Sequence, residues 1–85
     1  MDTWIVYILE CADKTLYTGI TRSIDQRLAA HRRGTASKYT RGRGPIRLVY
    51  QEMHASRSGA LKREATIKGM RRPEKQALIA APARR

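Results

Sequence analysis

Two strand-like runs separated by a short polar turn open the chain, and this hairpin constrains the fold more than any other feature. Residues 4–9 read WIVYIL and are apolar at both odd and even positions, which is typical of a strand covered on both faces. Residues 16–21 read LYTGIT and resume a strand pattern after the polar segment 12–14. The first run is therefore predicted to be a central strand that pairs with the second.

The length of the turn decides which side chains share a face of this hairpin. A three-residue loop places Tyr7 opposite Gly19, so that Tyr7 and Tyr17 become diagonal neighbours on one face. A two-residue loop would separate the tyrosines onto opposite faces. Gly19 is expected to leave open space above the sheet for a ligand or another backbone. The two tyrosines fit either ordinary packing of strand aromatics or a chemical site.

The charge of the chain is strongly positive. Lys and Arg number 18 against 7 Asp and Glu, which gives a net charge of +11 and predicts a polyanionic partner, nucleic acid first and an anionic membrane surface second. The 85 residues suit one domain, expected over residues 1–82 with a basic tail at 83–85. No apolar run approaches the roughly 18 residues of a membrane span, and a single cysteine cannot form an internal disulfide. We therefore expect an intracellular protein.

A capping box predicts a helix over residues 24–33. Ser23 is the expected N-cap and Gln26 completes the box three residues later. On this helix Arg27 and His31 are four residues apart and emerge side by side. Each also has an ordinary interpretation, Arg27 as a solvated surface charge and His31 as a boundary residue beside the apolar stripe.

Residues 34–45 are too polar and too rich in glycine for a regular element and are predicted to form a basic loop. Its cations would meet phosphates, while Tyr39 would stack on a base or bond a phosphate oxygen. The alternative is a solvated loop that Tyr39 anchors to the core. The candidate substrate-binding residues of this loop are Lys38, Tyr39, Arg41 and Arg43.

The remainder of the chain predicts one more strand and two more helices. A third strand within residues 46–53 would join the hairpin, with His54 in the following turn and without a role. One helix is expected over about residues 59–70 after a serine cap. Another is expected over residues 74–80 after a proline.

A carboxylate occupies the face of the second helix that is expected to point inward. Glu64 lies in the middle of this arc, where a charge is costly unless it is paired or binds a metal. The sequence leaves two interpretations open: an ion pair with Lys68 or a distant arginine, or a ligand for a hard cation. The other inward residues are expected to be Ala60, Leu61, Ala65 and Ile67, with Lys62, Arg63 and Thr66 outward.

These residues follow one another in a recognisable order. Ile5-Val6-Tyr7 and Tyr17-Thr18-Gly19 form two triplets, Arg27 and His31 follow on the first helix, and Glu64 lies on a later one. Over about residues 3–80 the order resembles the GIY-YIG nuclease superfamily, and most closely its small stand-alone bacterial members. The two triplets alone are a weak signal, whereas the complete ordered set is a strong one.

The resemblance implies an α/β fold with a three-stranded antiparallel sheet flanked by about three helices, in the order β-β-α-β-α-α. It implies a metal-dependent endonuclease that hydrolyses DNA phosphodiester bonds with one divalent cation, Mg²⁺ or Mn²⁺, and with no small-molecule cofactor. DNA is the expected substrate rather than RNA, and the enzyme is expected to recognise its structure or its damage and not its sequence. The expected role is in DNA repair or recombination, in the cytoplasm and in association with the nucleoid. A basic nucleic-acid-binding module without catalysis is the alternative.

The resemblance also implies a role for each residue of the set. Glu64 would bind the cation, and Arg27 would hold the scissile phosphate through its planar fork. Tyr17 would orient the water or a phosphate oxygen, and Gly19 would let the substrate approach. The chain has no asparagine beyond Glu64, where larger relatives use one, and Lys68 or Gln76 would stand in for it.

The resemblance implies that Tyr7 and His31 remove the proton of the attacking water. By the mechanism proposed for the family, Tyr7 would take this proton, which requires nearby cations that lower its pKa from about 10. His31 would receive or relay the proton. Some relatives carry a lysine after the second triplet where this chain has Ile20, so His31 is expected to carry more of the task.

Overall fold

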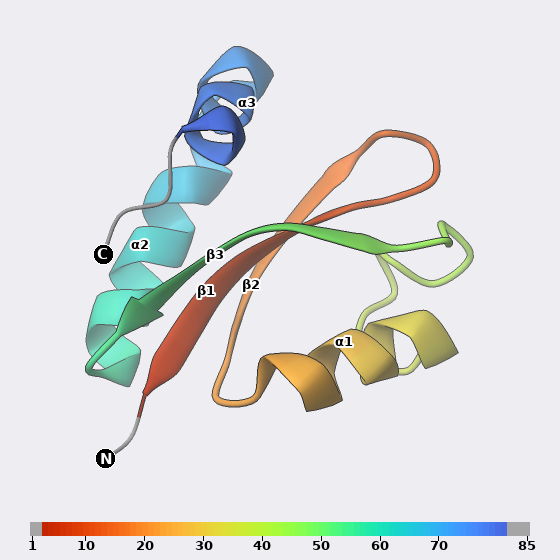
Figure 1. Ribbon diagram of the computed structural model, residues 1–85, viewed down its shortest axis with the longest axis horizontal. Coiled ribbons are helices and arrows are strands. Elements are labelled where there is room, and N and C mark those ends of the chain that lie inside the picture. The colour runs from red at the N-terminus through yellow and green to blue at the C-terminus, as the bar shows by residue number, and fades with distance from the viewer. Residues whose placement is uncertain (1–2, 82–85) are drawn as a thin grey trace.

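The computed structural model describes residues 3–81, which form a three-stranded antiparallel sheet with helices on both faces (Figure 1). The strands lie in the order β2-β1-β3, which makes β1 the central strand as predicted. The expected fold class and element order are confirmed, while the tail at 83–85 lies outside the described residues. The elements are β1 (Trp4–Glu10), β2 (Leu16–Thr21), α1 (Ile24–Arg33), β3 (Arg47–His54), α2 (Arg57–Lys68) and α3 (Arg72–Ala80).

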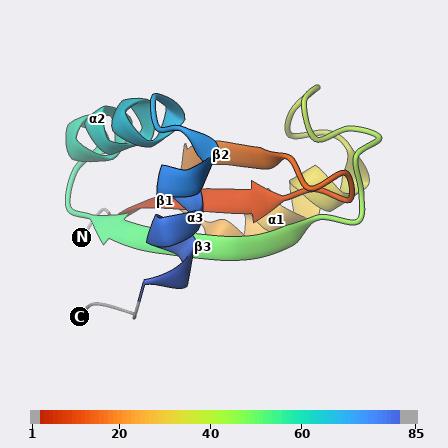
Figure 2. The same ribbon diagram turned by 90° about the horizontal axis from the view of Figure 1, so that it is seen from above.

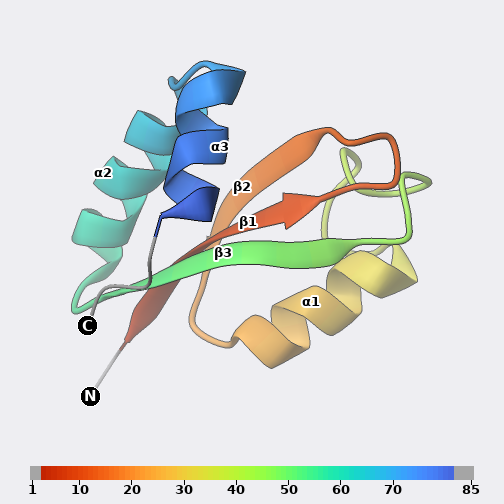
Figure 3. The ribbon, with the colours of Figure 1, turned by 45° about the horizontal axis from the view of Figure 1, so that its top comes forward.

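Strand β1 is buried on both faces because its alternate side chains pack under different helices. Val6 and Ile8 face α2 and α3, whereas Tyr7 and Leu9 face α1. Figures 2 and 3 show α1 on one side of the sheet and the other two helices opposite it. None of the helices within residues 3–81 has the length and apolar character required to cross a membrane.

The turn between β1 and β2 has the odd length that the site requires. The bond from Cys11 N to Thr15 O, 2.9 Å long, closes a three-residue loop. The resulting register pairs Tyr7 with Gly19. Tyr7 and Tyr17 consequently lie on the same face of the sheet, as predicted, with ring centroids 6.3 Å apart.

Helix α1 begins and ends where the capping signals predict. The Ser23 hydroxyl accepts a hydrogen bond from Gln26 N, 3.4 Å away. Gly34 ends the helix in the left-handed conformation, with φ of 81°. Ile24 and Leu28 pack against the sheet, which sets the orientation of the helix and of the two site residues it carries.

Helix α2 turns a different arc inward from the predicted one. Ala60 and Ile67 are buried and Glu64 is half-buried between them, whereas Leu61 and Ala65 face solvent. The apolar and polar faces of this helix differ little in hydrophobicity, so its sequence gives a poor indication of the buried side. The prediction that Glu64 lies on the inward side is confirmed.

A charged cluster between β3 and α2 holds the helix to the sheet. Arg63 Nε donates to both oxygens of Glu52, at 3.1 and 3.0 Å, and Tyr50 and His54 contact the same carboxylate. The outward orientation predicted for Arg63 is therefore wrong, because the carboxylate of Glu52 draws it inward. The prediction of His54 in a turn is also wrong, because His54 is the last residue of β3, where it contacts Glu52. Burial acts to raise the pKa of Glu52, but the hydrogen bonds outweigh it and the pKa is lowered.

Replacing Glu52 by glutamine should destabilise the fold by about 1–3 kcal/mol at neutral pH, since it removes charged hydrogen bonds. Because the folded pKa of Glu52 lies below the ordinary value of 4.5, this stability is present above that value and disappears as the pH falls through the folded pKa. Urea unfolding of the wild type and Glu52→Gln from pH 7 to below pH 4 measures the difference. Asp25→Asn, at an exposed position, serves as the control and should shift stability by less than about 0.5 kcal/mol. A Glu52→Gln deficit that stays constant across this range would contradict the ionic interpretation.

Candidate active site

Tyr7 is fully enclosed at the centre of the site, with 0% of the residue exposed. Its hydroxyl lies 2.9 Å from His31 Nε2 and accepts a hydrogen bond from Arg27 Nε at 3.4 Å. Both partners come from α1, where positions four apart project on the same side. The central strand and α1 therefore bring together three of the predicted residues around one phenolic oxygen.

His31 is buried, with 2% exposed, and does not lie at the boundary where its position on the helix had suggested. The predicted boundary position is wrong because the loop after α1 folds back over the ring. His31 Nδ1 lies 2.8 Å from the Thr40 hydroxyl, which is itself 1% exposed. Thr40 was missed from the sequence, because a threonine in a segment without a regular element has no periodicity that would indicate its burial.

Burial controls the protonation of this pair. It raises the pKa of Tyr7 to about 12, and the hydrogen bond from Arg27 lowers it only in part. Burial also lowers the pKa of His31, as does the charge of Arg27. The free protein does not supply the lowered pKa that the family's mechanism requires of Tyr7, because lost hydration outweighs one guanidinium. At neutral pH, Tyr7 holds its proton and His31 is uncharged.

Tyr17 connects the buried pair to the surface. Its half-buried ring lies 5.0 Å from the His31 ring and 5.7 Å from the Tyr39 ring, measured between centroids. Tyr39 remains 40% exposed, and the Arg43 guanidinium lies 4.5 Å from the centroid of its ring. Tyr39 is thus anchored to the site, as one interpretation of the loop proposed, while part of its surface stays open to solvent.

Gly19 lies against the Tyr7 hydroxyl. A Cβ atom added at Gly19 would be 2.6 Å from the hydroxyl oxygen of Tyr7 and 2.8 Å from its Cζ atom. The predicted open space above Gly19 is wrong, because the phenol fills it. The glycine instead gives Tyr7 the room to lie against β2 and reach α1.

Glu64 approaches from α2, which packs against β2. Its charge adds to the rise in the Tyr7 pKa, so the carboxylate lies within electrostatic range of the phenol. The side chain is 18% exposed, and its Oε2 lies 3.3 Å from Lys68 Nζ. Glu64 therefore forms the ion pair with Lys68 that was one of the two interpretations of its place on the helix.

The donor set is compatible with a hard cation. Within residues 3–81 no three His, Cys, Asp or Glu side chains gather at one point. Mg²⁺ and Mn²⁺ accept one or two protein carboxylates and complete their coordination with water and substrate phosphates. Glu64 fits this requirement if Lys68 releases its carboxylate.

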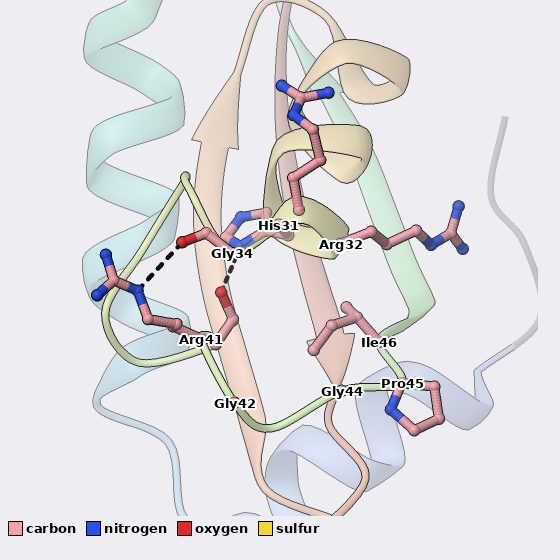
Figure 4. Close-up of a pocket in the computed structure, with 10 residues that line it drawn as sticks. His31, Arg32, Gly34, Arg41, Gly42, Gly44, Pro45 and Ile46 are labelled. Atoms are coloured by element: carbon pink, nitrogen blue, oxygen red, sulfur yellow. Dashed lines mark hydrogen bonds between the residues drawn. The ribbon is translucent and has the colours of Figure 1, made fainter.

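The cations of the basic loop differ in their contacts. Lys38 is exposed, and Arg43 pairs with Asp13 of the hairpin turn at 2.6 Å. Arg41 Nε donates to the carbonyl oxygen of Gly34 at 3.3 Å, where the loop and the end of α1, including His31, line an open pocket of about 530 Å³ (Figure 4). Arg43 thus lies with Tyr39, whereas Arg41 is held at the end of α1.

Two further cations lie beside Tyr39. Arg72 and Lys75 of α3 line a hollow of about 210 Å³ together with Tyr39 and the start of β2. Arg72 is held there by a hydrogen bond of 2.6 Å to the carbonyl oxygen of Lys14. This neighbourhood could not be predicted from the sequence, because only the packing of α3 brings Arg72 and Lys75 to the loop.

Comparisons with known proteins agree with this geometry. Residues 3–77 match the family model described as the GIY-YIG catalytic domain. The chain is 59% identical to a UPF0213 protein of Syntrophus aciditrophicus over 75 residues, covering 87% of this chain and 86% of that one. It is 48% identical to a UPF0213 protein of Staphylococcus aureus over 79 residues, covering 93% and 96%.

Two solution NMR structures are similar. A UPF0213 protein from Bacillus halodurans gives a TM-score of 0.61 at 42% identity, covering 92% of this chain and 83% of that one. A protein from E. faecalis gives a TM-score of 0.65 at 30% identity, covering 100% and 95%.

Gly19→Ala should destabilise the fold by about 1–3 kcal/mol, because the new methyl group would overlap a phenol that His31 and Arg27 hold in place. Urea unfolding measures the loss. Gly69→Ala is the matched control, since its added Cβ meets nothing closer than 3.6 Å and should leave stability within about 0.5 kcal/mol. Wild-type stability of Gly19→Ala would show that Tyr7 does not occupy the described position.

Proposed function

The chain belongs to the GIY-YIG catalytic domain family, a nuclease family, and on this premise we propose that it is a metal-dependent endonuclease that hydrolyses DNA phosphodiester bonds. The observation that carries the proposal is the meeting of Tyr7, Tyr17, Arg27 and His31 beside β2, with Glu64 approaching from α2. A phosphodiesterase needs an activated water, relief of charge on the phosphate and help for the leaving oxygen. These five side chains include groups for each task.

Arg27 would hold the scissile phosphate. Its hydrogen bond to Tyr7 is long, at 3.4 Å, and a phosphate offers the guanidinium two shorter, charge-assisted bonds. Turning toward the phosphate would free a lone pair on the Tyr7 oxygen. A water positioned by Tyr17 and the phosphate could then donate a proton to that oxygen.

Tyr7 and His31 would act together as the base. Tyr7 passes its own proton to His31 Nε2 as its oxygen receives a proton from the water. The water oxygen bonds to phosphorus and the bond to the leaving oxygen breaks. The raised pKa of Tyr7 and the lowered pKa of His31 suit this relay, because each group starts in the protonation state that it needs.

Glu64 would hold one Mg²⁺ or Mn²⁺ with several waters. When bound, the ion supplies positive charge to the phosphate oxygens and the leaving oxygen. Lys68, now 3.3 Å from the carboxylate, would exchange Glu64 for a phosphate of the substrate. The ion pair therefore keeps a phosphate-binding cation beside the carboxylate.

The charge distribution supports recognition of nucleic acid through its backbone. The net charge is +11, and Arg72 and Lys75 extend the cations near Tyr39. Phosphate contacts carry no sequence information, so we propose recognition by DNA structure or damage, with a role in repair or recombination.

One observation favours a second candidate, a nucleic-acid-binding module without catalysis. Tyr7 is fully enclosed and Glu64 is paired with Lys68, so both groups must be released before the reaction. Both candidates predict binding that weakens steeply with salt, so affinity alone does not separate them.

Nicking of supercoiled plasmid in Mg²⁺ or Mn²⁺ separates the two candidates. Glu64→Gln and Arg27→Ala should each slow nicking by about 10²–10³-fold, the usual cost of removing one group that stabilises transition-state charge. Asp25→Asn and Arg32→Ala change the charge by the same amounts at exposed positions of α1 and should nick at the wild-type rate.

Fluorescence anisotropy with the same DNA supplies the second measurement. Glu64→Gln removes a negative charge and should bind at least as tightly as the wild type. If the two proteins bind equally and also nick equally, or neither nicks, the endonuclease proposal fails and the binding module stands.

A further inference from the structure

A chain of hydrogen bonds runs from Arg27 through the site to the backbone of the basic loop. Arg27 Nε donates to the Tyr7 oxygen at 3.4 Å, and this oxygen lies 2.9 Å from His31 Nε2. His31 Nδ1 lies 2.8 Å from the Thr40 hydroxyl, which in turn donates to the carbonyl oxygen of Ser37 at 3.4 Å. Tyr7, His31 and Thr40 are each at most 2% exposed, so water does not complete these bonds.

The two ends of the chain determine the direction of every bond within it. The arginine can only donate, and the carbonyl oxygen of Ser37 can only accept. If the single hydroxyl proton of Thr40 goes to Ser37, the Thr40 oxygen must accept from an N–H at His31 Nδ1. His31 Nε2 then carries no proton and accepts from Tyr7.

The reverse direction leaves one proton without a partner. If Thr40 donated to His31 Nδ1, then Nε2–H would point at a Tyr7 oxygen that already accepts from Arg27. The phenolic proton would then have no acceptor among the contacts formed within residues 3–81. A buried donor without an acceptor is strongly disfavoured.

We propose that Thr40 is a positioning residue that fixes the tautomer of His31, so that Nε2 is the atom that accepts the Tyr7 proton. The inference deepens the proposed endonuclease function and rests on it for its catalytic consequence. The tautomer itself is a property of the free protein, because the hydrogen bond at one ring nitrogen sets the protonation of the other.

This arrangement needs no rearrangement during the proton transfer. Nδ1 carries a hydrogen both in the neutral tautomer and in the imidazolium that forms when Nε2 accepts a proton. Thr40 therefore accepts the same hydrogen bond before and after the step. A site that is already ordered for the charged state avoids the cost of reorganising as charge develops.

The test uses the full chain labelled with ¹⁵N and long-range proton–nitrogen correlation spectra of the histidine rings, above the pH at which His31 is charged. His31 of the wild type should show a hydrogen on Nδ1 and none on Nε2. Thr40→Ser keeps the hydroxyl and should keep this pattern. Thr40→Val keeps the shape but loses the hydroxyl, and should shift His31 toward the Nε2–H form.

Nicking rates of the same variants give the catalytic consequence. Thr40→Val should lose about 10–100-fold, the range found when a partner that orients a histidine ligand is removed, and Thr40→Ser should recover the loss. Thr18→Val is the matched control, because Thr18 is also buried, at 4%, but its hydroxyl has no hydrogen-bond partner within residues 3–81. It should leave both the tautomer and the rate unchanged.

Three results would overturn the inference. The first is an Nε2–H tautomer in the wild type, which needs no variant to fold. The second is an unchanged His31 tautomer in Thr40→Val, and the third is a nicking loss in Thr40→Val that Thr40→Ser does not recover. A wild type with the Nδ1–H tautomer that cuts no DNA would instead refute the endonuclease proposal and leave the assignment of Thr40 intact.

Discussion

The hydrogen bond between the Tyr7 hydroxyl and His31 Nε2 joins the central strand to α1, and the other parts of the site depend on it. Gly19 gives the phenol its room, and the three-residue turn places that glycine opposite it. Thr40 closes the far side of the imidazole. Because water is excluded from this bond, the phenol keeps its proton and the imidazole stays neutral, which is the starting state of a proton relay.

Much of the fold could be predicted from local sequence. The doubly apolar run at residues 4–9 identified the central strand, and Ser23 with Gln26 fixed the start of α1. Such signals act over a few residues and do not depend on distant packing. The buried face of α2 could not be predicted in this way, because Arg63 turns inward only to meet Glu52 of β3.

The candidate site, like the fold, could be predicted only in part. Hairpin register predicted that Tyr7 and Tyr17 share a face, whereas only the resemblance to a known family implied that His31 joins them. Local pattern cannot reveal burial, so it suggested open space over Gly19, which the phenol of Tyr7 fills. For the same reason it could not show that burial raises the pKa of Tyr7. Contacts of the basic loop were also beyond prediction, since a segment without a regular element has no periodicity from which to place its side chains.

The pH dependence of single-turnover nicking tests the central claim, that a protonated Tyr7 passes its proton to a neutral His31. Measured from about pH 5 to about pH 9, the rate should rise through the lowered pKa of His31 and then stay level, because Tyr7 keeps its proton until about pH 12. A rate that still rises about tenfold per pH unit at pH 9 would contradict the claim, because it would require a Tyr7 that loses its proton before the reaction.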